Sequence, residues 1–226
     1  MSTPVSGSVS WNTPNLASSG GTAVSADYNN LTKDVAFLYA KPWITVVMTG
    51  GSVTPANSAN PNAGGSQLFA TSVGSSVTVS TYQNSPASGA GSFVLGSDGN
   101  FAPPSNAPGN YRIRAQAVTN TSGVTFRLSL AVRNAGGTTI LTIPGRWTTG
   151  DVTSSGYREI ATVEALIPFN VSAYFGTATS FYVFTQYQQA TVPTIGAGDG
   201  GYTPSSTPPA YFTLCQAEFD GSYGSF

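Results

Sequence analysis

The clearest pattern along the chain is an alternation of apolar and polar residues between positions 109 and 134, interrupted by an Asn/Gly turn at 120–123. Period-two alternation on both sides of such a turn predicts an antiparallel β-hairpin. One face of the predicted hairpin is apolar and faces a core. The other face holds half of the eight Lys and Arg residues of the chain, namely Arg112, Arg114, Arg127 and Arg133.

The rest of the chain from residue 42 onward reads as further short strands separated by turn signals. Residues 42–48 open this region, and residues 138–143 are expected to pair with the second hairpin strand across a turn at 134–137. Residues 158–167, ending at Pro168, and 211–219 are later strands. A series of short strands with regular turns predicts an antiparallel β-sandwich.

The strand predicted at 181–188 is apolar on both of its sides. A strand of this kind is covered on both faces, one by the core and the other by a second surface. The two sides consist of Phe181, Val183 and Tyr187 and of Tyr182, Phe184 and Gln186.

A different period marks residues 25–39. Ser25 is a suitable N-cap, and Lys41 followed by Pro42 closes the segment, so it is predicted to be a short α-helix. The helix carries an apolar seam with heptad-like spacing, which is too short to be stable alone. It packs either on its own β domain or in a bundle around a symmetry axis. The seam consists of Val24, Tyr28, Leu31, Val35 and Leu38.

Residues 1–23 form an arm of small polar residues with few apolar anchors, among them Trp11 and Leu16. An arm with so little to bury is expected to order on a neighbour. Trp11 either caps the chain's own domain or docks on a partner. The domain organisation is therefore an attachment segment at 1–41 and a β-sandwich at 42–226.

The amino-acid composition limits the classes of binding partner that are expected. Charged residues make up 8% of the 226 residues and the net charge is −1, so neither nucleic acid nor an anionic membrane is an expected partner. No window approaches the roughly eighteen apolar residues of a membrane-spanning helix. The N-terminus lacks a basic start and an apolar region, so we expect synthesis in the cytosol without a signal peptide.

The sequence argues against catalysis. The chain has no histidine and a single cysteine, Cys215. Ser-His-Asp triads and Cys-His dyads are therefore excluded, and transition-metal sites are disfavoured. Cys215 lies in a strand-like run and is read as a buried, inert thiol. A GxGxxG run at 196–201 has no helix after it, so it is read as a loop. We expect no cofactor and no metal, and nothing selects a carboxylate pair for glycan cleavage.

The arginine row has two interpretations. The favoured one is a solvated or interface-facing row paired with acids such as Glu159, Glu164 or Glu218. The alternative is a site for phosphate or an acidic sugar. A further alternative places sugar binding on tyrosines and on the long loops at 50–66 and 190–209, because aromatic faces stack on pyranose rings.

Four segments together resemble the C1q/TNF-like jelly roll: 109–115, 125–130, 181–188 and 211–214. They cover roughly half of the chain. The resemblance implies an all-β antiparallel jelly-roll sandwich that forms a homotrimer, with aromatic faces buried around a threefold axis. It therefore implies a trimer interface at Tyr182, Phe184 and Gln186.

An N-terminal segment of the chain resembles a second class of proteins. Residues 25–39, followed by Lys41 and Pro42, resemble the short helix that opens many tailed-phage fibre and head-decoration proteins. Those proteins place an N-terminal arm and helix on the virion and project a jelly roll outward. The resemblance implies that Trp11 and Leu16 contribute to virion attachment and that the partners are other capsid or tail proteins.

Together these observations predict a non-enzymatic structural protein of a phage virion, made in the host cytoplasm. It would be a trimeric capsid-surface decoration or head-fibre protein anchored by its N-terminal segment. The alternative is a tail-fibre tip or adhesin that recognises host surface glycans, and a glycan-cleaving enzyme is a third hypothesis.

Overall fold

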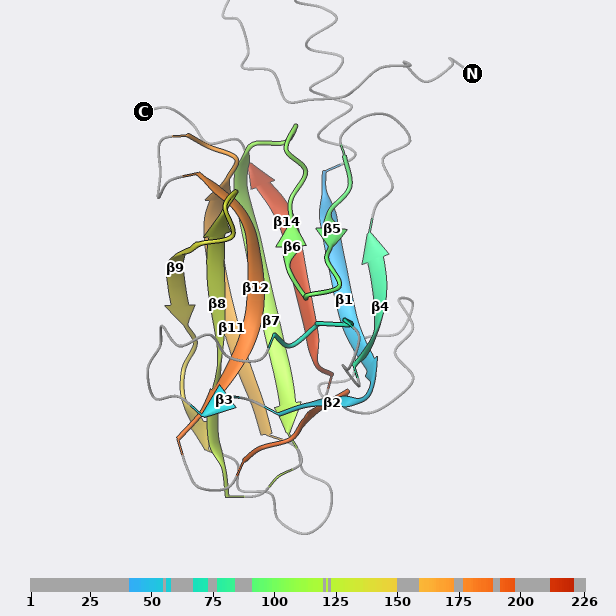
Figure 1. Ribbon diagram of the computed structural model, residues 1–226, viewed down its shortest axis with the longest axis vertical. Coiled ribbons are helices and arrows are strands. Elements are labelled where there is room, and N and C mark those ends of the chain that lie inside the picture. Colours follow the sequence, from blue (N-terminus) through green and yellow to red (C-terminus); the bar gives the residue numbers. More distant parts are fainter. Residues whose placement is uncertain are drawn as a thin grey trace, which may run out of the picture.

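The computed structural model describes a two-layered β-sandwich (Figure 1). The described residues are 41–54, 56–57, 67–72, 77–83, 91–119, 121, 123–149, 159–172, 177–188, 192–197 and 212–221. They include no helix, and hence none that is long and apolar enough to span a membrane. The predicted all-β antiparallel sandwich is confirmed. The predicted helix and the arm before it lie outside the described residues, and the domain division at residue 41 stays a prediction.

One layer, called sheet A, has the spatial order β2-β13-β7-β14-β1-β4, and β11 pairs with β7. All its pairings are antiparallel. Its strands are β1 (Trp43–Gly50), β2 (Ser52–Val53), β4 (Thr78–Gln83), β7 (Gly109–Thr119), β11 (Glu159–Phe169), β13 (Ile195–Gly196) and β14 (Leu214–Gly221).

The other layer, called sheet B, has the order β10-β8-β12-β6-β5, with β9 on β8. The two-residue β3 pairs with β12 in parallel, and the other pairings are antiparallel. Its strands are β3 (Ala56–Asn57), β5 (Val94–Leu95), β6 (Phe101–Ala102), β8 (Thr125–Asn134), β9 (Thr139–Pro144), β10 (Thr148–Thr149) and β12 (Ala178–Tyr187).

The hairpin predicted at 109–134 is wrong, although both of its strands exist. β7 pairs with β11, β13 and β14 in sheet A, whereas β8 pairs with β9, β10 and β12 in sheet B. The chain crosses from one layer to the other between them. Alternation determines which side chains face inward but does not determine the partner strand, so the two apolar rows meet across the interior. The four arginines consequently lie on opposite outer faces of the sandwich.

Other strand predictions are confirmed with small shifts. β8 and β9 form the expected hairpin, closed by a hydrogen bond in which Gly137 N donates to Asn134 O at 2.9 Å. β11 continues through Pro168, which the sequence places at the end of that strand. Proline is tolerated there because β11 is an edge strand whose described pairing is with β7 alone.

The interior is rich in aromatic rings. Phe101 of β6 and Phe181 of β12 are fully buried and stack with ring centroids 4.9 Å apart. Tyr111 of β7 contacts Phe93, Phe169 and Phe219 edge-on, and its hydroxyl donates to Ala107 O at 2.7 Å. Phe169 of β11 and Phe181 of β12 meet across the two layers with ring centroids 5.7 Å apart, and the hydroxyl hydrogen bond satisfies the one polar atom that Tyr111 brings into the core.

The sandwich begins and ends at the same pole, which we call the N-terminal pole and which lies at the top of Figure 1. Trp43 at the start of β1 lies opposite Glu218 near the end of β14. Phe219 N donates a hydrogen bond to Pro42 O at 2.9 Å. The β7 end at Thr119 and the β8 start at Thr125 lie at the opposite pole.

Removal of the Phe181 ring tests the aromatic core. We expect Phe181→Ala to lower the free energy of unfolding by roughly 3–5 kcal/mol, because it removes the stacked contact with Phe101 and leaves a cavity between the layers. Urea unfolding followed by circular dichroism measures the change. The matched control is Val94→Ala on β5, where the side chain is 61% exposed, with an expected change within about 0.5 kcal/mol. Equal losses in both variants would contradict this packing.

A second prediction concerns alkaline pH. Burial raises the pKa of the Tyr111 phenol and of the Cys215 thiol, because desolvation disfavours their charged forms. In the unfolded chain these groups lose their protons above about pH 10 and about pH 8.5 respectively. Their contribution to stability is therefore complete at neutral pH and declines as the pH rises through this range. Urea midpoints should fall between pH 7 and about pH 10.5.

Cys215→Ala separates the two groups. In this variant the decline should begin later, near the ordinary tyrosine pKa of about 10. A midpoint that stays constant up to pH 10.5 in the unmodified chain would show that neither group is buried as described.

Candidate functional site

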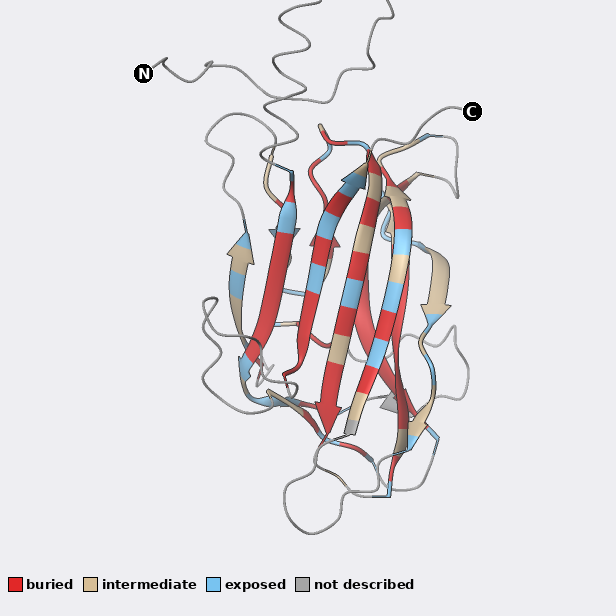
Figure 2. Ribbon diagram, turned by 180° about the vertical axis from the view of Figure 1, so that it is seen from behind, coloured by how far each residue is buried: buried red, intermediate tan, exposed pale blue. Residues whose placement is uncertain are grey.

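Along β14, β7 and β11 of sheet A, exposed or half-buried positions alternate with buried ones, so the outward side chains line up in cross-strand rows (Figure 2). Strand register places one member of each row on β1, β14, β7 and β11. Exposed positions alternate with buried ones along β14, so the outward side chains follow from period two. The first row is Trp43, Glu218, Arg112 and Leu166, and the second is Thr45, Gln216, Arg114 and Glu164.

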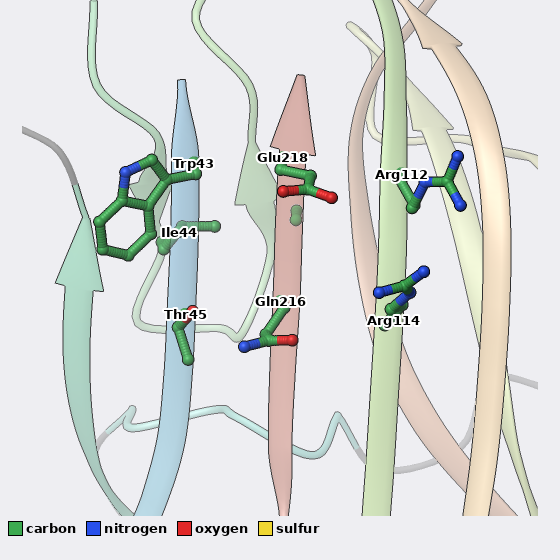
Figure 3. Close-up of a pocket in the computed structure, with 8 residues that line it drawn as sticks. Trp43, Ile44, Thr45, Arg112, Arg114, Gln216 and Glu218 are labelled. Carbon is green, nitrogen blue, oxygen red and sulfur yellow. The ribbon is translucent and has the colours of Figure 1, made fainter. Parts of the chain in front are cut away.

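A shallow hollow of about 210 Å³ lies on this face, over β14 (Figure 3). The close-up shows Trp43 and Thr45 on β1 at one rim and Arg112 and Arg114 on β7 at the other. Two side chains of β14, Gln216 and Glu218, stand between the rims, and Ile44 and Ala217 complete the lining. We call this set of residues the sheet A hollow.

Ion pairs hold the two arginines of the hollow. Arg114 Nε donates to Glu164 Oε1 at 3.0 Å, and Arg112 Nη1 lies 3.6 Å from the same oxygen. Arg112 Nη2 donates to Asp220 Oδ2 at 3.2 Å, and this hydrogen bond is the main cause that raises the pKa of Arg112. Such exposed pairs stabilise a fold by about 0–1 kcal/mol, so their main effect here is to orient the guanidinium groups.

The interpretation of the arginine row as acid-paired is confirmed for Glu164. Glu218 acts on Arg112 only as a nearby charge.

The two exposed side chains of β14 keep their hydrogen-bonding capacity. Within the described part of the chain, neither the Gln216 amide nor the Glu218 carboxylate forms a side-chain hydrogen bond or ion pair. An amide offers both donors and acceptors, and a carboxylate offers acceptors. The hollow thus presents unused polar groups on β14, and the exposed indole of Trp43 lies at its rim on β1, directed toward β4 (Figure 3).

On the outer face of sheet B, the arginines pack against aromatic rings, and among the described residues they do not pair with acids. Arg127 is 8% exposed, donates from Nε to Gln186 Oε1 at 2.9 Å and lies over the Trp147 ring, 4.3 Å from its centroid. Burial lowers the pKa of Arg127. Arg133 lies 4.3 Å from the Tyr182 ring centroid, and its Nη1 donates to Asn100 Oδ1 at 3.2 Å. Both guanidinium groups are therefore packed on aromatic faces, which stabilises a cation.

The residues predicted for the trimer interface lie on this face of sheet B. Tyr182, Phe184 and Gln186 are 4%, 1% and 0% exposed within a single chain. The expectation that both faces of this strand are covered is confirmed. Arg127 and Arg133 of the same chain supply part of the cover, and a subunit contact at these residues stays a prediction.

Several other predicted residues lie outside the described part of the chain. They are the attachment residues Trp11 and Leu16 and the seam residues Val24, Tyr28, Leu31, Val35 and Leu38. Most of the two loops considered for sugar binding and most of the GxGxxG run also lie outside it. Cys215 is fully buried in the core, as expected. Among the described residues, no group of three or more acids, cysteines or histidines could hold a metal ion.

Sequence reasoning missed the sheet A hollow. Trp43 falls in the predicted opening strand, where it shares the outward face with the polar Thr45 and alternates with Ile44 and Val46, although Thr45 is only 8% exposed. That alternation was a usable signal for an exposed tryptophan. No pattern in the sequence indicated that β14 would lie between β1 and β7.

Comparison with known proteins identifies no family. No family model matches the chain, and no curated protein matches it. Among solved structures, the Eiger TNF of S. frugiperda is similar at 12% identity and a TM-score of 0.43, over 81% of this chain and 96% of that one. Infectious bursal disease virus structures are also similar. The structure of the Gt strain is similar at 11% identity and a TM-score of 0.32, over 79% of this chain and 56% of that one.

The VP2 subviral particle of the same virus is similar at 13% identity and a TM-score of 0.27, over 81% of this chain and 58% of that one. This chain thus spans a little over half of these viral chains. With identities below 25% and TM-scores below 0.5, these similarities carry no argument about function.

Proposed function

We propose that this chain is a non-enzymatic structural protein of a tailed-phage virion. Residues 1–41 attach it to the particle, and the β-sandwich projects from that attachment as a homotrimeric capsid-surface decoration or head-fibre protein. The resemblance of residues 25–42 to the attachment segments of phage proteins is the reason for proposing that the particle is a phage virion. The geometry of the sandwich supports the arrangement.

The observation that carries the proposal is that the chain enters and leaves the described sandwich at the same pole. Residue 42 enters the sandwich at the N-terminal pole, where Pro42 O accepts the hydrogen bond from Phe219 N. An anchor that precedes residue 42 therefore holds the molecule by one pole. Within the described residues, the pole formed by Thr119 and Thr125 lies away from this entry point, as a protein standing on a particle surface requires.

The surface chemistry agrees with a role in assembly. Charged residues are scarce, and on sheet A Arg112 and Arg114 are neutralised by acids of the same chain. A decoration protein acts by burying surface against neighbouring subunits, which favours the assembled state by mass action. It requires no reacting group, and Cys215 lies in the interior where no reagent reaches it.

The first prediction of this proposal is a trimer. Light scattering of the purified full-length chain should give a mass near three times 23.1 kDa. The mass should be independent of concentration in the micromolar range if the interface reaches the area of a stable complex. A clean monomer would contradict the trimer and turn the interpretation toward a solitary binding module.

The second prediction concerns attachment. A chain that lacks residues 1–41 should keep the circular dichroism of a β-sandwich but lose binding to particles stripped of the native protein, because the sandwich no longer carries its anchor. Cosedimentation with particles measures this, and a full-length Val94→Ser variant at an exposed site is the control. Undiminished particle binding by the shortened chain would contradict the proposal. Retained binding to host cells, with particle binding lost, would favour the adhesin alternative.

A further inference from the structure

The sheet A hollow brings an exposed aromatic ring and unused polar groups together on one rigid face. We propose that it binds a neutral pyranose sugar unit of a glycan. This site differs from the distal loops that the sequence suggested for sugar binding. It is independent of the virion role, since the hollow lies in the sandwich itself.

The size of the hollow limits its occupant. At about 210 Å³ it is smaller than the roughly 300–1,000 Å³ of pockets that enclose drug-sized ligands. It is also partly open along the sheet face rather than fully enclosed. Such a site suits one ring of a longer chain, with the remaining units continuing into solvent.

Trp43 supplies the apolar contact. Its side chain is 39% exposed at the rim formed by β1, although a large aromatic ring on a soluble domain is usually well buried. An indole offers a flat apolar face at a low cost in conformational entropy. The C–H faces of a pyranose are flat and apolar too, so the two surfaces match when they stack.

Polar groups around the ring match sugar hydroxyls, which donate and accept at the same time. The Gln216 amide and the Glu218 carboxylate stand in the middle of the hollow, with no side-chain partner among the described residues. Opposite them, Arg114 uses Nε for Glu164 and keeps its terminal nitrogens as donors. A carboxylate and a guanidinium on neighbouring strands can therefore hold adjacent hydroxyls by charge-assisted hydrogen bonds.

The local charge selects a neutral sugar over an acidic one. Arg112 and Arg114 are already paired with Glu164 and Asp220, and Glu218 adds a further negative charge. The carboxylate of a sialic or uronic acid in the hollow would lie beside the Glu218 carboxylate, and placing like charges side by side disfavours binding.

The groups of the hollow are held in place before any ligand arrives. They stand on β1, β14 and β7, which pair in continuous register, and the ion pairs to Glu164 and Asp220 orient both guanidinium groups. Sites built on strands keep their geometry better than sites on loops. Little ordering is therefore required of the protein when a sugar binds.

The test uses the labelled full-length chain on an array of neutral hexose and N-acetylhexosamine oligosaccharides, with sialylated and sulfated counterparts beside them. The expected result is binding to a subset of the neutral glycans and none to their acidic counterparts at the hollow. Calorimetry with the strongest neutral oligosaccharide then gives the dissociation constant for each variant. No binding to any neutral glycan, or binding to acidic glycans alone, overturns the proposal, including the case in which a second copy covers this face.

Variants locate the site. Gln216→Ala and Glu218→Gln change exposed side chains, so they should fold normally and weaken binding by at least about tenfold each. Trp43→Ala should abolish detectable binding, whereas Trp43→Phe, which keeps a flat ring, should retain part of it. The matched control is Leu166→Ala, which is 55% exposed in the same cross-strand row but outside the hollow and should bind normally. Unchanged affinity in both β14 variants would place any sugar binding elsewhere and overturn the proposal.

Discussion

The whole structure depends on burying the inward rows of β7 and β8 against each other across the interior. Tyr111 of β7 and Phe181 of β12, the neighbour of β8, both contact Phe169 of β11, and these buried rings link the two layers. Once these rows face inward, period two forces every second residue of the same strands outward. The outer faces, and with them the sheet A hollow, are therefore consequences of how the core is built.

The arginines on the two outer faces have different environments. On sheet A, Arg112 and Arg114 stay exposed and pair with Glu164 and Asp220. On sheet B, Arg127 is buried with no carboxylate partner among the described residues, and desolvation disfavours its charge. The Trp147 ring and the Gln186 amide offset that cost. One face thus remains open to a ligand, while the other is already packed.

Attachment and recognition can coexist in this arrangement. The chain enters at the N-terminal pole, where Pro42 and Phe219 are hydrogen-bonded, and the hollow begins beside this contact with Trp43 and Glu218 and continues over β14 and β7. The proposed attachment uses residues 1–41 and the proposed sugar site uses the sandwich, so the two roles require different residues.

The sequence by itself determined the fold class, most strand positions and which residues face the core, because period-two alternation reports directly on which side of a strand is buried. It also identified Cys215 as an inert core residue. Strand partners were decided only by the tertiary structure: 109–119 and 125–134 look like a hairpin but lie in different layers. The hollow could not be predicted for the same reason. Trp43, Glu218 and Arg112 are far apart in sequence, and only the register of β1, β14 and β7 makes them neighbours.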